Sequence, residues 1–160
     1  MAYLLSENRH KDPLGYWQPY ERYIDSVKDR MPPGALKLAL SRDWYDFNVH
    51  SCPHDGWLEE LRIIESDSAS SLPRFNSAEV RLLGAYHDGF ICLRYPRLIS
   101  MNIQTLQLAK GFGDWLYDEF RLSEKGNLLH EIEWASGSRW LIESDDVEVL
   151  WQPFVNGSEV

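Results

Sequence analysis

One short segment of the sequence gathers side chains that can bind a metal ion. Two imidazoles, a thiol and a carboxylate fall within residues 50–55, and a second His-Asp pair follows further along the chain. Zinc accepts nitrogen, sulfur and oxygen donors in a tetrahedron. The chain has neither a Cys-x-x-Cys pair nor a His-Glu-x-x-His helix, so we favour no cofactor and keep a metal-binding protein or metal-dependent hydrolase as an alternative. The candidate metal ligands are His50, Cys52, His54, Asp55, His87 and Asp88.

Both His-Asp pairs belong to a short internal repeat. His54-Asp55-Gly56-Trp57-Leu58 is followed later by His87-Asp88-Gly89-Phe90-Ile91. We interpret both as turns that enter a strand, in which Asp caps the turn and Gly adopts a positive φ. This interpretation predicts both glycines at positive φ and both aromatic side chains mostly buried, side by side if their strands pair.

Support for nucleophilic catalysis is weak. The sequence contains no Gly-x-Ser-x-Gly elbow and no glycine-rich phosphate loop. Cys92 lies in an apolar run typical of a buried, inert thiol. Cys52 lies between two histidines that can lower its pKa, but no orienting group is visible. His130 shares a face with apolar residues, which indicates a hydrogen-bonded core histidine. The sequence therefore favours a protein that is not an enzyme, with no catalytic residue.

Nearly all of the net negative charge lies in the last third of the chain. The net charge is −9, and residues 111–160 contribute −8 of it, with three basic and eleven acidic residues. Such a field attracts cationic partners and speeds their association. We therefore expect a basic protein partner, and a homodimer stays open. The acids predicted to form this surface are Asp114, Asp118, Glu119, Glu131, Glu133, Glu143, Asp145, Asp146 and Glu148.

Composition excludes several classes of protein. The 160 residues suit one domain, and 44% hydrophobic with 13% aromatic residues exceed what a disordered chain contains. An acidic chain lacks the basic footprint that non-specific nucleic-acid binding needs. No stretch has the roughly 18 apolar residues of a membrane span, and the N-terminus lacks a signal-peptide pattern. We expect a cytoplasmic protein with two reduced cysteines and no membrane or nucleic-acid partner.

The apolar pattern predicts helices first and strands afterwards. Spacings of three and four favour a helix from Trp17 or Gln18 to Arg30. For residues 35–41 we prefer a helix over a strand, although leucines alternate there. Period-two runs bounded by turn residues follow, while Gln104–Gly113 is ambiguous. The predicted strands are Gly56–Ser66, Ala78–Tyr86, Gly89–Tyr95, Trp115–Ser123, Leu128–Ala135, Ser138–Ser144 and Val147–Trp151.

These elements predict an α+β fold. Glycine-containing turns such as Lys125-Gly126-Asn127 and Ser136-Gly137 favour hairpins, and hairpins build an antiparallel sheet. We expect N-terminal helices packed on a largely antiparallel meander sheet of about six or seven strands. One domain would cover residues 1–160, helical over 14–41, sheet over 54–152, with a loose tail at 155–160.

The segment from Cys52 to Trp151 resembles small uncharacterised bacterial domains from toxin-immunity gene neighbourhoods. The resemblance rests on His54-Asp55-Gly56-Trp57 at the start of a strand and on Trp115-Leu116-Tyr117-Asp118-Glu119. It implies a non-enzymatic, cytoplasmic inhibitor and transfers no catalytic residue. Our leading hypothesis is an immunity-type inhibitor that docks an acidic surface on a basic toxin domain. A binder of a small ligand with an aromatic pocket is a further alternative.

Overall fold

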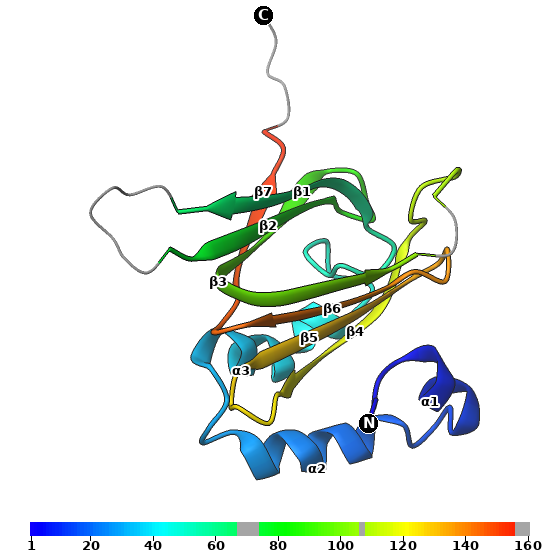
Figure 1. Cartoon of the computed structure of the whole chain (residues 1–160). Coiled ribbons are helices and arrows are strands. Elements are labelled where there is room, and N and C mark those ends of the chain that lie inside the picture. The colour runs from blue at the N-terminus through cyan, green and yellow to red at the C-terminus, as the bar shows by residue number, and fades with distance from the viewer. Residues whose placement is uncertain (67–73, 106–107, 156–160) are drawn as a thin grey trace, which may run out of the picture.

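Seven antiparallel strands form one strongly bent sheet, and four short helices precede it (Figure 1). The computed structural model describes residues 1–66, 74–105 and 108–155, and these counts refer to those residues. The α+β class and the antiparallel meander are as predicted. The helices are α1 (Ser6–Lys11), α2 (Trp17–Val27), α3 (Pro33–Ala39) and α4 (Arg42–Tyr45). The strands are β1 (Trp57–Glu65), β2 (Asn76–Leu83), β3 (Gly89–Gln104), β4 (Trp115–Leu122), β5 (Leu128–Trp134), β6 (Arg139–Ser144) and β7 (Glu148–Pro153).

The hairpins of β4, β5 and β6 are formed by glycine-containing turns and by strands with alternating side chains. Gly126 and Gly137 have φ values of 81° and 85°, so both predicted hairpin turns are confirmed. Along β5, buried and half-buried side chains alternate strictly, with Leu128 and Trp134 among those facing the core. This alternation is the period-two pattern that the sequence shows.

The long strand β3 joins the two halves of the sheet. Its first part, Gly89–Arg94, pairs with β7, and its last part, Leu98–Gln104, pairs with β6. Pro96 lies between these two pairings, and the register between β3 and β2 also shifts there, as expected where a proline lies within a strand. The strand order is β1-β2-β3-β6-β5-β4. The prediction that this strand ends at Tyr95 is therefore wrong by nine residues.

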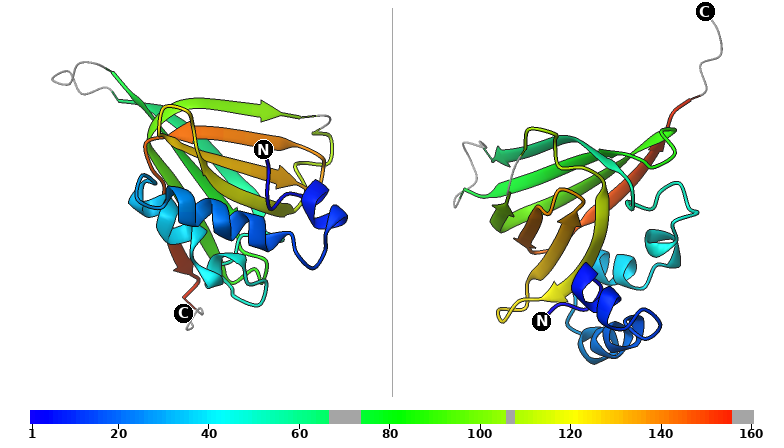
Figure 2. Two further views of the ribbon diagram at one scale, coloured as in Figure 1. Left: turned by 90° about the horizontal axis from the view of Figure 1, so that it is seen from below. Right: turned by 90° about the vertical axis from the view of Figure 1, so that its right-hand side faces the viewer.

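The sheet curls until its two outer strands touch at one end. The amide N–H of Asp55 donates to the carbonyl of Trp115 at 2.8 Å, and Trp115 N–H donates to the carbonyl of Gly56 at 2.9 Å. An isolated bridge links Trp57 with Asp114. From there β1 and β4 diverge (Figure 2). The core fills the space between the two halves and the helices.

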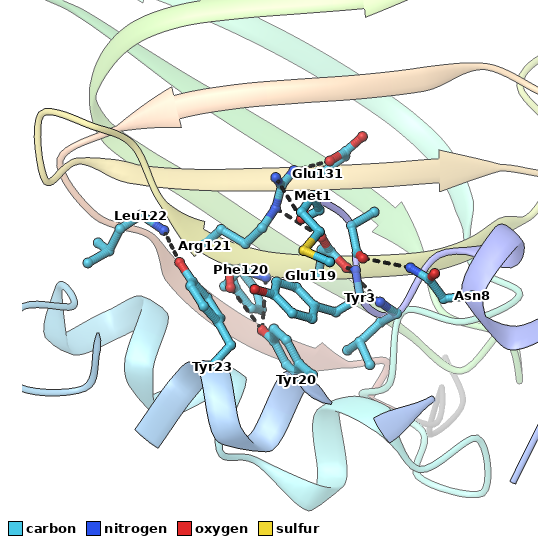
Figure 3. Close-up of polar contacts among 12 residues, drawn as sticks. Met1, Tyr3, Asn8, Tyr20, Tyr23, Glu119, Phe120, Arg121, Leu122 and Glu131 are labelled. Atoms are coloured by element: carbon cyan, nitrogen blue, oxygen red, sulfur yellow. Dashed lines mark hydrogen bonds and ion pairs between the residues drawn. The ribbon is translucent and has the colours of Figure 1, made fainter. Parts of the chain in front are cut away.

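Helix α2 runs along the outer edge of β4 (Figure 3). Its buried face carries Tyr20, Ile24 and Val27. The Tyr20 hydroxyl donates to the carbonyl of Phe120 and accepts from its N–H, both at 3.0 Å. The Tyr23 hydroxyl accepts from a further β4 amide, that of Leu122, at 2.8 Å. Tyrosine side chains thus satisfy backbone groups of an edge strand that would otherwise be open to pairing.

The N-terminal segment lies against the same strand. The amides of Tyr3 and Leu4 donate to Oε2 of Glu119 at 2.7 and 2.6 Å (Figure 3). Leu4 and Leu5 are fully buried. The short helix α1, which apolar periodicity does not predict because it has no buried residue, follows directly. A carboxylate therefore anchors the start of the chain to the sheet.

The predictions for the short helices had mixed outcomes, and two other predictions fall partly outside the described residues. Helix α3 confirms a helix rather than a strand near residues 35–41, and α4 was not predicted. Residues 106–107, inside the ambiguous stretch, and residues 156–160 of the predicted tail lie outside the described residues. None of the described helices is both long and apolar enough to span a bilayer.

Candidate functional site

The His-Asp-Gly repeats form turns, but glycine is required in them for a different reason from the predicted one. Positive φ falls on Asp55 (62°) and His87 (56°), whereas neither Gly56 nor Gly89 has it. A Cβ on Gly89 would lie 2.4 Å from the Trp151 ring. A Cβ on Gly56 would lie 2.8 Å from a backbone carbonyl oxygen. The prediction of positive φ at these glycines is wrong; close approach of neighbouring groups requires them.

The aromatic residues after these glycines also differ from the prediction. Trp57 is 49% exposed, and its indole N–H donates to Oδ1 of Asp114 at 2.8 Å. Phe90 is half-buried. Strand β2 lies between β1 and β3, so the two rings are not on neighbouring strands. Trp57 instead contacts the ring of His87, with centroids 4.5 Å apart.

Among the described residues, the candidate metal ligands meet only in pairs, such as His54 and Asp55, whose Nε2 and Oδ1 atoms lie 3.4 Å apart. Cys52 is buried, and its thiol donates to the carbonyl of Trp44 at 3.0 Å. Burial raises the pKa of this thiol to about 12, which opposes the activated state considered from the sequence. The Nδ1 of His54 hydrogen-bonds the carbonyl of Leu116 at 2.5 Å.

His50 contacts the aspartate of the second His-Asp pair. Its Nδ1 forms a hydrogen bond with Oδ2 of Asp88, and its ring stacks on Tyr86 with centroids 4.0 Å apart. Across the described parts of the chain, no three His, Cys, Asp or Glu side chains are grouped as a metal site would require. The alternative of a metal-dependent hydrolase therefore gains no support from geometry.

Asp118 belongs to the core and not to the predicted acidic surface. It is 4% exposed, and its Oδ2 accepts from the Trp44 indole and from Nε2 of His130, both at 2.9 Å. Oδ1 accepts from the indole of Trp115 at 3.3 Å. The other ring nitrogen of His130 meets the Tyr95 hydroxyl at 2.7 Å. This confirms the predicted core histidine and corrects the placement of Asp118: three N–H donors stabilise its charge inside the protein.

Glu119 is likewise buried and unavailable to a partner. It is 0% exposed, since the N-terminal segment covers it. Its Oε1 lies 2.9 Å from Nε of Arg121, which also pairs with Glu131. The predicted assignment of Glu119 to an exposed surface is therefore corrected too.

Most of the other predicted acids bind groups of the chain itself. Asp146 accepts from the first free amides of α3, those of Gly34 and Ala35, at 3.0 and 2.9 Å. This is a helix N-cap supplied from 111 residues away. The remaining contacts are Asp114 with Trp57, Glu131 with Arg139, Glu133 with the Ser6 amide, Glu143 with Asn127 and Glu148 with Arg94, while Asp145 is exposed.

A large concave surface lies between α2 and the segment from the end of α3 to Asn48. We call it the α2–α4 groove; its volume is about 980 Å³. Its carboxylates are Glu21, Asp25 and Asp46, and its guanidinium groups are Arg9 and Arg42. Its aromatic walls are formed by Tyr16, Trp17, Tyr20, Tyr45 and Phe47.

The walls of the groove are locked by ring contacts. Trp17 packs edge-on against Tyr45, with centroids 4.9 Å apart, and against Tyr20 at 5.8 Å. The hydroxyl of Tyr45 is buried, and burial raises its pKa well above the ordinary value of 10.0. An aromatic concavity with a few polar groups is the usual form of a binding site.

Sequence reasoning missed this groove. Tyr20 lies within the predicted helix, whereas Tyr45 and Phe47 lie in a region with no predicted element. No local signal marks the groove, because Trp17 continues the apolar stripe of Tyr20, Ile24 and Val27 at spacings of three, four and three. The chain has no match among protein-family models, curated proteins or solved structures.

Proposed function

We propose that the protein is a non-enzymatic binding protein that holds a basic segment of a protein partner in the α2–α4 groove. The observation that carries this proposal is the combination of aromatic walls with the carboxylates of Glu21, Asp25 and Asp46. Cationic side chains bind both chemistries, through the faces of aromatic rings and through ion pairs. A net charge of −9 attracts such a partner from a distance.

The shape of the groove favours a macromolecule over a small ligand. Its volume of about 980 Å³ lies at the upper end of small-molecule pockets, and the groove is open to solvent. Leu40 at its rim is 62% exposed and Phe47 is 46% exposed. Exposed apolar side chains beside aromatic residues are typical anchors of protein interfaces.

Inhibition of a bacterial toxin in the cytoplasm is the biological role that we propose for this binding. The resemblance of residues 52–151 to domains from toxin-immunity neighbourhoods supports this role, although the groove itself is formed by residues 9–48, outside that segment. The contact surface differs from the one expected from sequence, because Asp118 and Glu119 are buried. The acids of the last strands would act mainly through their long-range field, and the groove would make the contacts.

Co-expression with a basic toxin domain encoded next to this gene tests the proposal. The double variant Leu40→Ser/Phe47→Ser should weaken binding by calorimetry at least about tenfold and abolish protection of growth, since hot-spot truncations typically cost above 1 kcal/mol each. Leu150→Ser/Phe154→Ser is the matched control, because these side chains are 55% and 44% exposed and lie outside the groove. Equal loss in both double variants would refute the groove as the binding site.

A further inference from the structure

The groove already holds one guanidinium between two aromatic rings. The guanidinium carbon of Arg9 lies 3.8 Å from the ring centre of Tyr117 and 4.5 Å from that of Tyr16. Nε of Arg9 donates to the carbonyl of Leu4 at 2.6 Å, and its Nη1 donates to the Tyr16 hydroxyl at 2.9 Å. The planar cation is therefore held by ring faces and by acceptors at its edge.

This arrangement continues as a column of planar groups. Tyr117 stacks on His54 with centroids 5.6 Å apart, and His54 stacks on Phe47 at 3.7 Å with an angle of 9° between the rings. The stacked column thus runs Tyr16, Arg9, Tyr117, His54, Phe47. Both of its end residues line the groove.

The column is open at Phe47. His54 covers one face of the Phe47 ring, yet 46% of the residue is exposed and the residue lines the groove, so part of the side chain can contact a further planar group. The adjacent Asp46 is exposed, and its Oδ1 accepts from the amide and side chain of Asn48 at 2.9 and 3.0 Å. Within the described residues its Oδ2 makes no hydrogen bond or ion pair, and Asp46 and Phe47 line the same groove, so a free acceptor and a partly exposed ring border one concave surface.

We infer that the groove recognises arginine: the guanidinium of a partner arginine stacks on the exposed part of Phe47 and donates to Asp46. The inference rests on the proposed function, since it names the side chain that the basic segment inserts. A guanidinium is planar, weakly hydrated and able to donate from its edge while its face is stacked. A lysine ammonium lacks the plane and loses a tighter hydration shell on the same contact.

Capped arginine (N-acetyl-arginine methylamide) and capped lysine are the probes. In ¹H–¹⁵N NMR titrations, capped arginine should shift the amides of residues 46–48 and bind at least about twofold more tightly than capped lysine, because lysine keeps part of an exposed cation–π contact but lacks the planar stacking. Phe47→Leu should abolish this preference. Phe154→Leu should keep it, because Phe154 has nearly the same exposure, 44%, but lies outside the groove. Asp46→Asn should weaken arginine binding while the preference over lysine persists.

The outcomes separate this inference from the proposed function. Equal binding of both probes, or shifts confined to the last strands, overturns the arginine inference. If Leu40→Ser/Phe47→Ser still abolishes binding of the toxin domain in that case, the proposed function stands. If capped arginine shows the expected preference but the toxin domain binds that double variant normally, the subsite stands and the proposed function fails.

Discussion

The carboxyl group of Glu119 couples the N-terminal segment to pH. Burial raises its pKa above the ordinary value of 4.5, although the amides of Leu4 and Tyr3 and the guanidinium of Arg121 oppose the shift. The folded state thus favours the protonated form, so this group lowers the free energy of unfolding as pH rises from 4.5 through the raised pKa. Relative to Glu119→Gln, wild-type protein should lose stability over that window and level off above it. Urea unfolding at a series of pH values measures the free energy of unfolding of both proteins. A wild type that gains stability relative to Glu119→Gln as pH rises would contradict the prediction.

Gly89 is the residue where a single methyl group should matter most. An alanine Cβ there would lie 2.4 Å from one Trp151 ring carbon, 2.6 Å from another and 2.7 Å from the carbonyl oxygen of Gln152. Gly89→Ala should lower the free energy of unfolding by about 1–3 kcal/mol, as overpacking does. Adding Trp151→Leu should recover part of this loss, because the clashing ring is removed. Strict additivity of the two changes in denaturant unfolding would argue against a ring clash.

At the scale of elements, α2 protects β4 through hydroxyl groups. Tyr20→Phe would leave the N–H and C=O of Phe120 without partners in a buried setting, where each lost partner costs about 1–3 kcal/mol. We expect this loss in urea unfolding, with faster hydrogen exchange of the Phe120 amide. Tyr86→Phe is the control, since it removes a single exposed hydrogen bond to Phe47 and should change stability by about 0.5 kcal/mol or less. Similar losses of stability in both variants would show that the hydrogen bonds of the Tyr20 hydroxyl to β4 contribute no more than an exposed hydrogen bond does.

The sequence predicted elements well where local chemistry decides them. Gly126 and Gly137 mark their hairpins because only a positive φ closes such turns. The extension of β3 beyond Pro96 was missed because proline normally ends a strand, and only tertiary structure shows that the strand changes partners there. The same limit applies to Asp118, whose three N–H donors include the Trp44 indole, 74 residues away in the chain. The groove was missed for a related reason, since its two walls are brought together only by packing of the helices.

At the scale of the whole molecule, the two thiols report on different events. Cys52 is buried, with a pKa of about 12, whereas Cys92 is only half-buried, although burial raises the pKa of Cys92 as well. A thiol reagent at neutral pH should label Cys92 in the native state and Cys52 only as fast as the protein unfolds, because the thiolate is the reactive form. Mass spectrometry of the wild type and of Cys92→Ser follows the two reactions. Rapid labelling of Cys52 in native Cys92→Ser would show that the core around Trp44 opens locally.

The anchoring of Leu4 by Glu119 imposes an order on biosynthesis. The two groups are 115 residues apart, and ribosomes add roughly 5–20 residues per second, so the first residues wait roughly 6–23 s for their partner. During this interval the leucines at the start of the chain and the apolar face of α2 have no β4 to cover them. The nascent chain therefore exposes an apolar surface until late in translation. Slow codons placed before β4 should increase its dependence on chaperones, whereas slow codons after β5 should not.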